Sequence, residues 1–258
     1  MAMMRRVKPI SHEDEVSIVE HLDELRARIV VSATVFGVAL ALCFWQNHLL
    51  LELASAPLPA AHHKLITFGI TEPFTTTVTV SAYGAIILSL PIILYEAYAY
   101  LLPAFSDQQR KAVVPLLLLI PVLFIAGILF GYFVVLPSAT KFLLNFNDSQ
   151  FNIQVRAKEY YGFFAQTLLA CGIVFQVPVG ILATVRLGIV KVSQLQQNRR
   201  YAYLACAVLA AALPGVDPVS MLLETAPLIA LYELSIVLAR LFGEPKPASL
   251  TEPAAQKP

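Results

Sequence analysis

The stretch Glu20-His21-Leu22-Asp23-Glu24-Leu25-Arg26-Ala27-Arg28 runs directly into Ile29–Leu51, a segment without Lys, Arg, Asp or Glu. This junction decides the fold class, because about 18 or more apolar residues in a row predict a membrane-spanning helix. Glu24 and Arg28 are four residues apart, the spacing at which helical side chains face each other. Glu20 shares that face, so acidic charge is in excess where the chain meets the membrane. The spacing alone also fits an amphipathic helix on the membrane surface.

Apolar segments of this kind recur along the chain. Of its 258 residues, 58% are hydrophobic and 14% are charged, whereas soluble domains are about 25% charged. The charges cluster and leave six apolar stretches, which are Ile29–Leu51, Pro73–Tyr95, Ala112–Thr140, Tyr160–Val185, Tyr201–Val216 and Pro218–Ala239. The fifth is short, and Pro and Gly residues around Asp217 predict a tight turn to the sixth. We therefore predict an all-α membrane protein with six transmembrane helices.

Lys and Arg fall mostly on one side of the predicted membrane. With six spans both chain ends share one side, and an excess of positive charge marks the cytoplasmic side. The side of the chain ends carries Arg5, Arg6, Lys8, Arg26, Arg28, Arg110, Lys111, Arg186, Lys191, Arg199, Arg200, Arg240, Lys246 and Lys257. The opposite side carries Lys64, Lys141, Arg156 and Lys158. We therefore predict that both termini are cytoplasmic.

The chain divides into one membrane domain with a polar segment at each end. We predict a cytoplasmic N-terminal segment over residues 1–28, which contains the motif around Glu24, and a six-helix transmembrane domain over 29–240. Residues 241–258 are rich in Pro, Ala and charge, a composition that predicts a disordered cytoplasmic tail.

Prolines occur throughout the predicted spans, at Pro91, Pro115, Pro121, Pro137, Pro178 and Pro227. A proline removes a backbone hydrogen bond and tends to bend its helix. Bends in several neighbouring helices predict a concave bundle, and a concave wall offers a docking surface for another helix.

Acidic residues within the predicted spans are candidates for function, because charge inside lipid is costly. Glu96 lies near the cytoplasmic end of the second span among tyrosines, where an acid also fits the membrane interface. Glu224 and Glu233 are nine residues apart on the last span and therefore face opposite sides of a helix. One alternative is an ion-coupled secondary transporter that uses these acids, although the chain shows no visible internal repeat.

The sequence does not suggest an enzyme. No glycine-rich phosphate loop is present, and no nucleophile, base and metal-ligand set can be assembled. Cys43, Cys171 and Cys206 lie within apolar runs without the paired spacing of a metal or redox site. The adjacent His62 and His63 do not suit one metal ion. We predict no enzymatic activity, no metal and no cofactor.

Six sequence blocks, in order along the chain, carry a family resemblance. They are His21-Leu22-Asp23-Glu24-Leu25-Arg26, Ser55-Ala56-Pro57-Leu58, Pro91-Ile92-Ile93-Leu94-Tyr95-Glu96 through Leu102-Pro103-Ala104-Phe105, Arg110-Lys111-Ala112-Val113-Val114-Pro115, Gly131-Tyr132-Phe133-Val134-Val135-Leu136-Pro137 and Phe175-Gln176-Val177-Pro178-Val179. On these blocks the chain resembles the TatC family of the twin-arginine translocase, the six-helix receptors of an export route for folded proteins. The resemblance implies a multi-pass protein of the prokaryotic plasma membrane.

The resemblance also implies a binding site for cargo signal peptides, in which two adjacent arginines precede an apolar stretch. An acid of the family's N-terminal motif matches Glu24, and carboxylates suit bidentate pairing with guanidinium groups. The family's second acid falls on Gln109, a departure, because an amide carries no charge. Asp107, Glu96 or Glu20 would then supply the missing carboxylate. The residues that the resemblance implies for this site are Glu24, Gln109, Arg26, Asp107 and Glu20.

Further partners follow from the same resemblance. Small single-span subunits of the TatA and TatB type would dock at the fifth and sixth spans, and Gln176 stands where the family often has Glu. The implied docking residues are Gln176, Asp217, Met221 and Glu233. Transport would be driven by the proton-motive force in a complex with several copies of this chain. The lipid bilayer is the remaining partner, and no nucleic acid is expected.

Overall fold

The regular structure of the described chain is helical. A computed structural model describes residues 18–59, 64–101, 107–146, 148–151, 153–186, 188–212 and 218–242. One isolated backbone bridge, between Ile66 and Arg156, joins two loops within this part of the chain. Helices suit a membrane because they satisfy their own backbone hydrogen bonds, which lipid cannot do. The all-α prediction is therefore confirmed for these residues.

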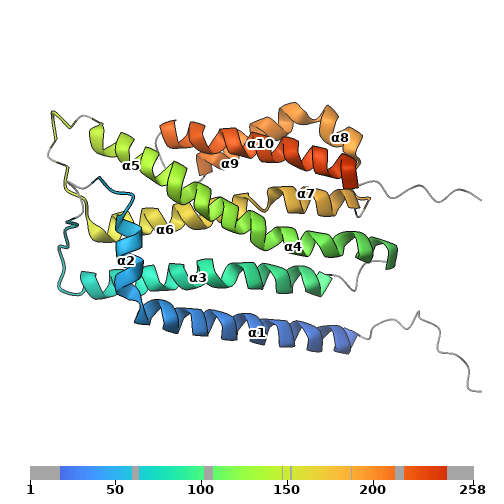
Figure 1. Ribbon diagram of the computed structural model, residues 1–258, viewed down its shortest axis with the longest axis horizontal. Coiled ribbons are helices and arrows are strands. Elements are labelled where there is room, and N and C mark those ends of the chain that lie inside the picture. Colours follow the sequence, from blue (N-terminus) through green and yellow to red (C-terminus); the bar gives the residue numbers. More distant parts are fainter. Residues whose placement is uncertain are drawn as a thin grey trace, which may run out of the picture.

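The helices follow one another in the order α1 (Ile18–Trp45), α2 (Asn47–Ser55), α3 (Glu72–Leu101), α4 (Asp107–Phe130), the π-helical turn η3 (Gly131–Val135), α5 (Leu136–Asn145), α6 (Ala157–Val174), α7 (Val177–Arg186), α8 (Val192–Gln197), α9 (Arg199–Ala212) and α10 (Pro218–Phe242). The start of α1 and the end of α10 lie at the same end of the bundle (Figure 1). α1 packs mainly against α3 at one edge, and α10 packs against α7 and α9 at the other.

Five helical segments of the described chain are long and apolar enough to cross a membrane, namely His21–Trp45, Glu72–Tyr100, Leu118–Asn145, Ala157–Arg186 and Met221–Arg240. The remaining predicted span corresponds to α9, which has 14 residues. A helix rises about 1.5 Å per residue, so α9 is roughly 21 Å long, against a hydrocarbon core of about 30 Å. Five of the six predicted spans are therefore supported, and a span at α9 stays a prediction.

The first apolar run forms two helices and not one. α1 ends at Trp45, and α2 begins at Asn47 and lies across α3 (Figure 1). The Asn47 side chain donates a hydrogen bond of 2.8 Å to the Phe44 carbonyl, beside the break. The prediction of a single span over Ile29–Leu51 was wrong at its end, because the polar pair Gln46-Asn47 interrupts the apolar run.

Proline and a π-turn interrupt two other spans. α6 and α7 are separated at Phe175 and Gln176, and Pro178, which has no backbone N–H to continue the helix, is the second residue of α7. η3 inserts a wider turn between α4 and α5, ahead of Pro137. Pro91 lies inside α3 and Pro227 inside α10. The helix therefore breaks beside Pro178, whereas α3 and α10 continue through their prolines, and the concave shape of the bundle stays a prediction.

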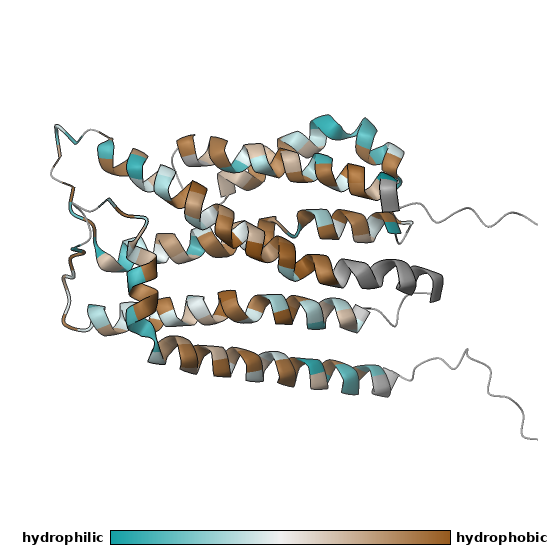
Figure 2. Ribbon diagram, in the orientation of Figure 1, coloured by the Kyte–Doolittle hydropathy of each residue, from teal (hydrophilic) through white to brown (hydrophobic). Residues whose placement is uncertain are grey.

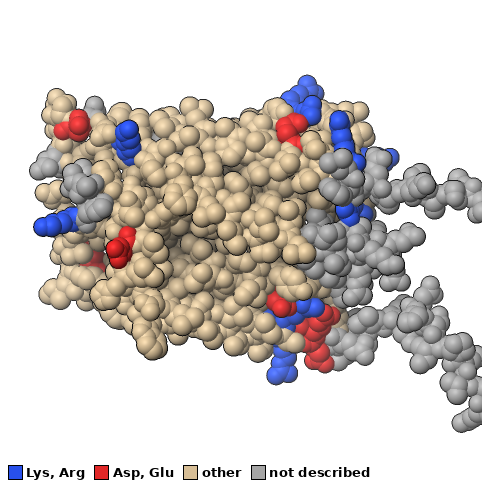
Figure 3. All heavy atoms as spheres, viewed as in Figure 1, with Lys and Arg blue, Asp and Glu red and all other residues tan. Residues whose placement is uncertain are grey.

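Charge and hydropathy divide the molecule into a belt and two ends. The middle of the bundle is covered mostly by apolar residues (Figure 2), and charged side chains gather at the two ends (Figure 3). An uncharged belt between charged ends is the pattern that a bilayer requires, because charge at its centre is costly.

Two glycines allow α4 and α6 to approach closely. A methyl group on Gly127 would lie 2.6 Å from the Cys171 carbonyl oxygen, and one on Gly172 would lie 2.6 Å from a ring carbon of Phe124. Such small residues let backbones approach, which is typical of helix packing in membranes. This crossing holds the long helix α4–η3–α5 against the centre of the bundle.

Two tyrosines fix the C-terminal end of α2. The hydroxyl of Tyr160 on α6 donates a hydrogen bond of 2.7 Å to the Ala54 carbonyl, and the hydroxyl of Tyr132 in η3 donates one of 3.0 Å to the Leu53 carbonyl. The last carbonyls of a helix have no partner within the helix. The tyrosines therefore supply the donors that the end of α2 lacks.

An ion pair joins the two loops at the same end of the molecule. Arg156 Nε donates to Glu72 Oε1 at 2.9 Å, and its Nη2 donates to Glu72 Oε2 at 3.2 Å. The hydrogen bonds with Glu72 raise the pKa of Arg156 above its ordinary value. The backbone bridge between Ile66 and Arg156 lies beside this ion pair. Its two hydrogen bonds run from Ile66 N to Val155 O at 3.0 Å and from Ala157 N to Ile66 O at 2.9 Å. The loops before α3 and α6 are thus held together.

Candidate functional site

An arginine at the first turns of α1 holds two acids from two helices. Arg28 Nη2 and Nε donate to Glu24 Oε1 at 2.6 and 3.1 Å, and Arg28 Nη1 donates to Glu96 Oε2 at 2.7 Å. Glu24 lies one turn earlier on α1, and Glu96 lies near the end of α3. One guanidinium therefore bridges two carboxylates, and the trio carries one net negative charge.

The packing of α1 on α3 brings these three side chains together. The two helices run antiparallel, so the beginning of α1 and the end of α3 lie at the same depth (Figure 1). His21 and Tyr100 stack beside the trio, with ring centroids 4.4 Å apart. The side chains of Arg28, Glu24 and Glu96 are 25%, 33% and 20% exposed. The trio is thus partly exposed at the end of the bundle.

An apolar groove begins at the trio and continues between the two helices. It has a volume of about 630 Å³, and Arg28 and Glu96 belong to its lining. The rest of the lining is almost entirely apolar or aromatic and consists of Leu25, Ile29, Ser32, Ala33, Phe36, Ile93, Ala97 and Tyr100. The residues from α1 recur every three or four positions, which places them on one face of that helix. The site therefore combines a charged end with an apolar groove.

The structure decides between two interpretations of the motif around Glu24. The motif continues without interruption from Ile18 into the span that ends at Trp45. The amphipathic surface helix is therefore wrong for residues 18–28, because these residues are the first turns of a single long helix.

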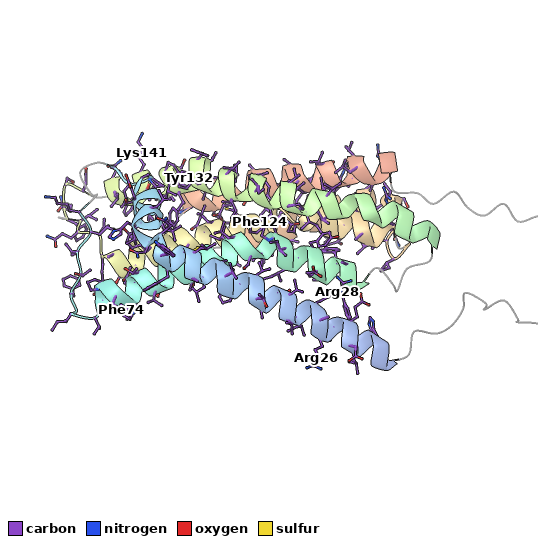
Figure 4. The ribbon with its side chains drawn as sticks, turned by 60° about the horizontal axis from the view of Figure 1, so that its bottom comes forward. Arg26, Arg28, Phe74, Phe124, Tyr132 and Lys141 are labelled. Carbon is purple, nitrogen blue, oxygen red and sulfur yellow. The ribbon has the colours of Figure 1, made fainter. Side chains whose placement is uncertain are left out.

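Not every predicted signal-peptide residue belongs to the trio. Arg26 is exposed and points away from α3, whereas Arg28 points toward it (Figure 4). Among the described residues Arg26 forms no ion pair. Glu20 lies in the first turn of α1, and Asp107 and Gln109 lie in the first turn of α4, which starts at the same end of the bundle. The side chains of Glu20, Asp107 and Gln109 lie outside the described part, so their roles stay predictions.

The predicted docking residues for partner helices lie apart from the trio. Gln176 Nε2 donates a hydrogen bond of 3.1 Å to the Ile120 carbonyl of α4, a neighbouring helix of the same chain. Its Oε1 is buried and has no partner among the described residues. Met221 packs partly buried against the core formed by α7, α9 and α10. Asp217 lies outside the described residues.

Glu233 is held by the neighbouring helix α9. Its carboxylate accepts hydrogen bonds from Arg199 Nη2 at 2.7 Å and from the Tyr203 hydroxyl at 2.6 Å. Glu224, on the opposite face of α10, is buried. The prediction that these acids cannot share a site is therefore confirmed. The transporter alternative relied on Glu96, Glu224 and Glu233. Two of these acids, Glu96 and Glu233, form ion pairs with arginines.

Sequence reasoning missed that Arg28 binds Glu96. The signal was present in the chain, because Arg28 opens one predicted span and Glu96 closes the next. Consecutive spans run antiparallel, so their charged ends at one membrane face lie close to each other. Opposite charges at matching depth on neighbouring spans would have predicted the pair.

Comparisons with known proteins agree on one family. The family described as "Sec-independent protein translocase protein (TatC)" matches residues 20–227. A Sec-independent protein translocase protein TatC from Desulforapulum autotrophicum is 36% identical over 249 residues, which are 95% of this chain and 92% of that protein. A chloroplastic TATC protein from Oryza sativa is 35% identical and covers 90% of this chain and 65% of its own length. A crystal structure of a twin-arginine translocase receptor, TatC, superposes with a TM-score of 0.72 at 32% identity, over 86% of this chain and 99% of that one.

Proposed function

The chain belongs to the TatC family of Sec-independent protein translocase proteins, and on this premise we propose that the trio of Glu24, Arg28 and Glu96 binds the paired arginines of cargo signal peptides. As a translocase component the protein has a transport role and is not an enzyme. The proposal places cargo recognition where α1 meets the end of α3. The observation that carries it is the bridging of two carboxylates by one guanidinium.

The geometry of the trio supports binding of an arginine. Both carboxylates already accept a short hydrogen bond from a guanidinium, at 2.6 Å for Glu24 and 2.7 Å for Glu96, and such charge-assisted bonds are stronger than neutral ones. Glu96 thereby supplies a carboxylate that Gln109 does not. An arginine presents five N–H donors in a planar fork, whereas lysine presents a compact point charge. The site should therefore prefer arginine to lysine.

The apolar groove accounts for the other part of a signal peptide, the apolar stretch that follows the arginines. Ala33 and Phe36 of α1 line the groove one to two turns beyond Arg28, so an apolar segment would continue into it once the arginines are bound. Burial of apolar surface contributes about 25 cal/mol per Å². Recognition would therefore combine charge pairing at one end with apolar burial along the groove.

The membrane arrangement completes the proposal. We place the trio at the cytoplasmic face, because most Lys and Arg residues lie on the side of the chain ends. α9 and α10 would form the fifth and sixth membrane elements, with α9 too short for a bilayer of ordinary thickness. A short span thins the bilayer locally. Small single-span subunits would dock at these two helices and act with this chain in transport driven by the proton-motive force.

The first experiment measures binding of a signal peptide with Arg-Arg, and of the same peptide with Lys-Lys, to the purified protein in detergent. The unmodified protein should bind the Arg-Arg peptide more tightly. Glu24→Gln and Glu96→Gln should each reduce that binding about 10-fold or more, because hydrogen bonds to charged groups contribute roughly 1.5–3 kcal/mol.

The control is Glu52→Gln, which removes an exposed acid on α2 at the far end of the molecule. It should leave the preference for Arg-Arg unchanged. Equal binding of both peptides to the unmodified protein, or equal losses in all three variants, would contradict the proposed site.

A further inference from the structure

We infer that Arg28 is an internal competitor of cargo, which occupies the two carboxylates of the trio until a cargo arginine displaces it. This inference rests on the proposed function, because it concerns how that same site is regulated. It goes further in giving Arg28 a role of its own, as the occupant that keeps the site closed to weak cationic ligands.

The contacts of Arg28 support this role. Three of its N–H groups are used, two on Glu24 Oε1 and one on Glu96 Oε2. These are the interactions that a cargo arginine would make, in the same geometry and with the same acids. An incoming guanidinium therefore has to take over bonds that are already formed.

The charge of the trio explains why cargo still binds. Two carboxylates and one guanidinium leave one negative charge, which a single further arginine neutralises. Arg28 and one cargo arginine could then divide the two acids between them. A second cargo arginine would complete the displacement of Arg28, which gives a paired motif an advantage over a single cation.

Partial exposure makes the exchange possible. The side chains of the trio are 25%, 33% and 20% exposed, so its ion pairs are not sealed inside the bundle, and exposed pairs are individually weak. Arg28 should therefore lower the affinity for cargo by a modest factor. We expect about fivefold, which corresponds to about 1 kcal/mol.

The test is the affinity of the Arg-Arg and Lys-Lys peptides for Arg28→Gln and Arg28→Lys. Without a competing guanidinium, Arg28→Gln should bind both peptides about fivefold more tightly. The ratio of the two affinities should stay the same, because both peptides carry two cations and have to displace Arg28 to the same extent. Arg28→Lys keeps the charge but loses the planar fork, so its gain should be about twofold.

The charge-matched control is Arg240→Gln. It removes one positive charge from an exposed side chain near the end of α10, at the same end of the bundle as the trio. Measurements at physiological ionic strength, where the screening length is about 8 Å, keep the general effect of that charge small. The gain of Arg28→Gln is therefore judged against that of Arg240→Gln, with helical circular dichroism recorded for each variant.

A second readout follows Arg28 directly. In the unmodified protein, the nitrogen resonance of the Arg28 Nε group should shift when the Arg-Arg peptide is added, because Arg28 leaves Glu24.

The outcomes separate the two proposals. If the unmodified protein prefers Arg-Arg but Arg28→Gln gains no more than Arg240→Gln, or loses affinity, Arg28 positions the acids and does not compete. The inference is then wrong while the proposed function stands. If Arg28→Gln does not fold, an Arg28→Lys affinity equal to or below that of the unmodified protein overturns the inference. If the unmodified protein does not distinguish the two peptides, the proposed function fails and the inference fails with it.

Discussion

Because α4 and α6 approach closely at Gly127, we predict that Gly127→Ala lowers the free energy of unfolding. The new methyl group would lie 2.6 Å from the carbonyl oxygen of Cys171 and 2.9 Å from two side-chain carbons of Phe175. Ordinary contacts of this kind begin at 3.4 Å, so α4 and α6 would have to separate by 0.8 Å, the difference of these distances. The obstacle is backbone and cannot rotate away as a side chain could.

The magnitude follows from two opposing effects. Overpacking of a well-packed interior costs about 1–3 kcal/mol, and a backbone obstacle places this substitution in the upper part of that range. Alanine also favours a helix over glycine by about 1 kcal/mol. The free energy of unfolding should therefore fall by about 1–2 kcal/mol in Gly127→Ala.

Unfolding in mixed micelles of increasing denaturing detergent, followed by helical circular dichroism, measures this change. Gly162→Ala on α6 is the matched control, because a methyl group there meets no atom within 4 Å. It should be neutral or stabilising by up to about 1 kcal/mol. Equal stability of Gly127→Ala and Gly162→Ala would refute the argument that close backbone contact holds α4 against α6.

Two further substitutions test single hydrogen bonds with the same unfolding assay. Tyr160→Phe removes the buried hydroxyl that binds the Ala54 carbonyl and should lower the free energy of unfolding by about 1 kcal/mol. The control Tyr95→Phe, at an exposed tyrosine, should change it little. Equal losses in the two variants would mean that the bond to α2 contributes nothing to stability. Gln176→Leu removes the bond to Ile120 but also the buried Oε1 that lacks a partner among the described residues. These effects oppose each other, so the net loss should stay below about 0.6 kcal/mol, the average for such bonds in membranes. A larger loss would show that Oε1 is satisfied in the folded protein.

Sequence patterns predicted the spans because lipid imposes a simple rule on them. A charge-free run must be helical and must be long enough, and Pro73–Tyr95 lies wholly within α3 for that reason. The rule says less about where a helix ends and the chain changes direction. The apolar run from Ile29 continues past Trp45, yet the chain changes direction at Gln46, because two amide side chains suit the membrane interface better than its interior. Composition averaged over the run does not register such a local change.

The site was predictable in part. The spacing of Glu24 and Arg28 along one helix follows from helical geometry, and the structure confirms that they pair. The bond from Arg28 to Glu96 depends on which helices are neighbours and on their rotation about their own axes. Those are set by packing, such as the stacking of His21 on Tyr100, which no spacing along the chain reveals. The groove between α1 and α3 arises from the same packing.

The tyrosine bonds at the C-terminal end of α2 have a consequence for the order in which the protein is made. Ala54 and Tyr160 are separated by 106 positions in the chain, and Leu53 and Tyr132 by 79. A ribosome that has just finished α2 has therefore synthesised neither of the hydroxyls that complete it. The carbonyls at the end of α2 receive these two hydrogen bonds only after η3 and then α6 have been made. Closure of this end of the bundle is thus a late step in the formation of the fold.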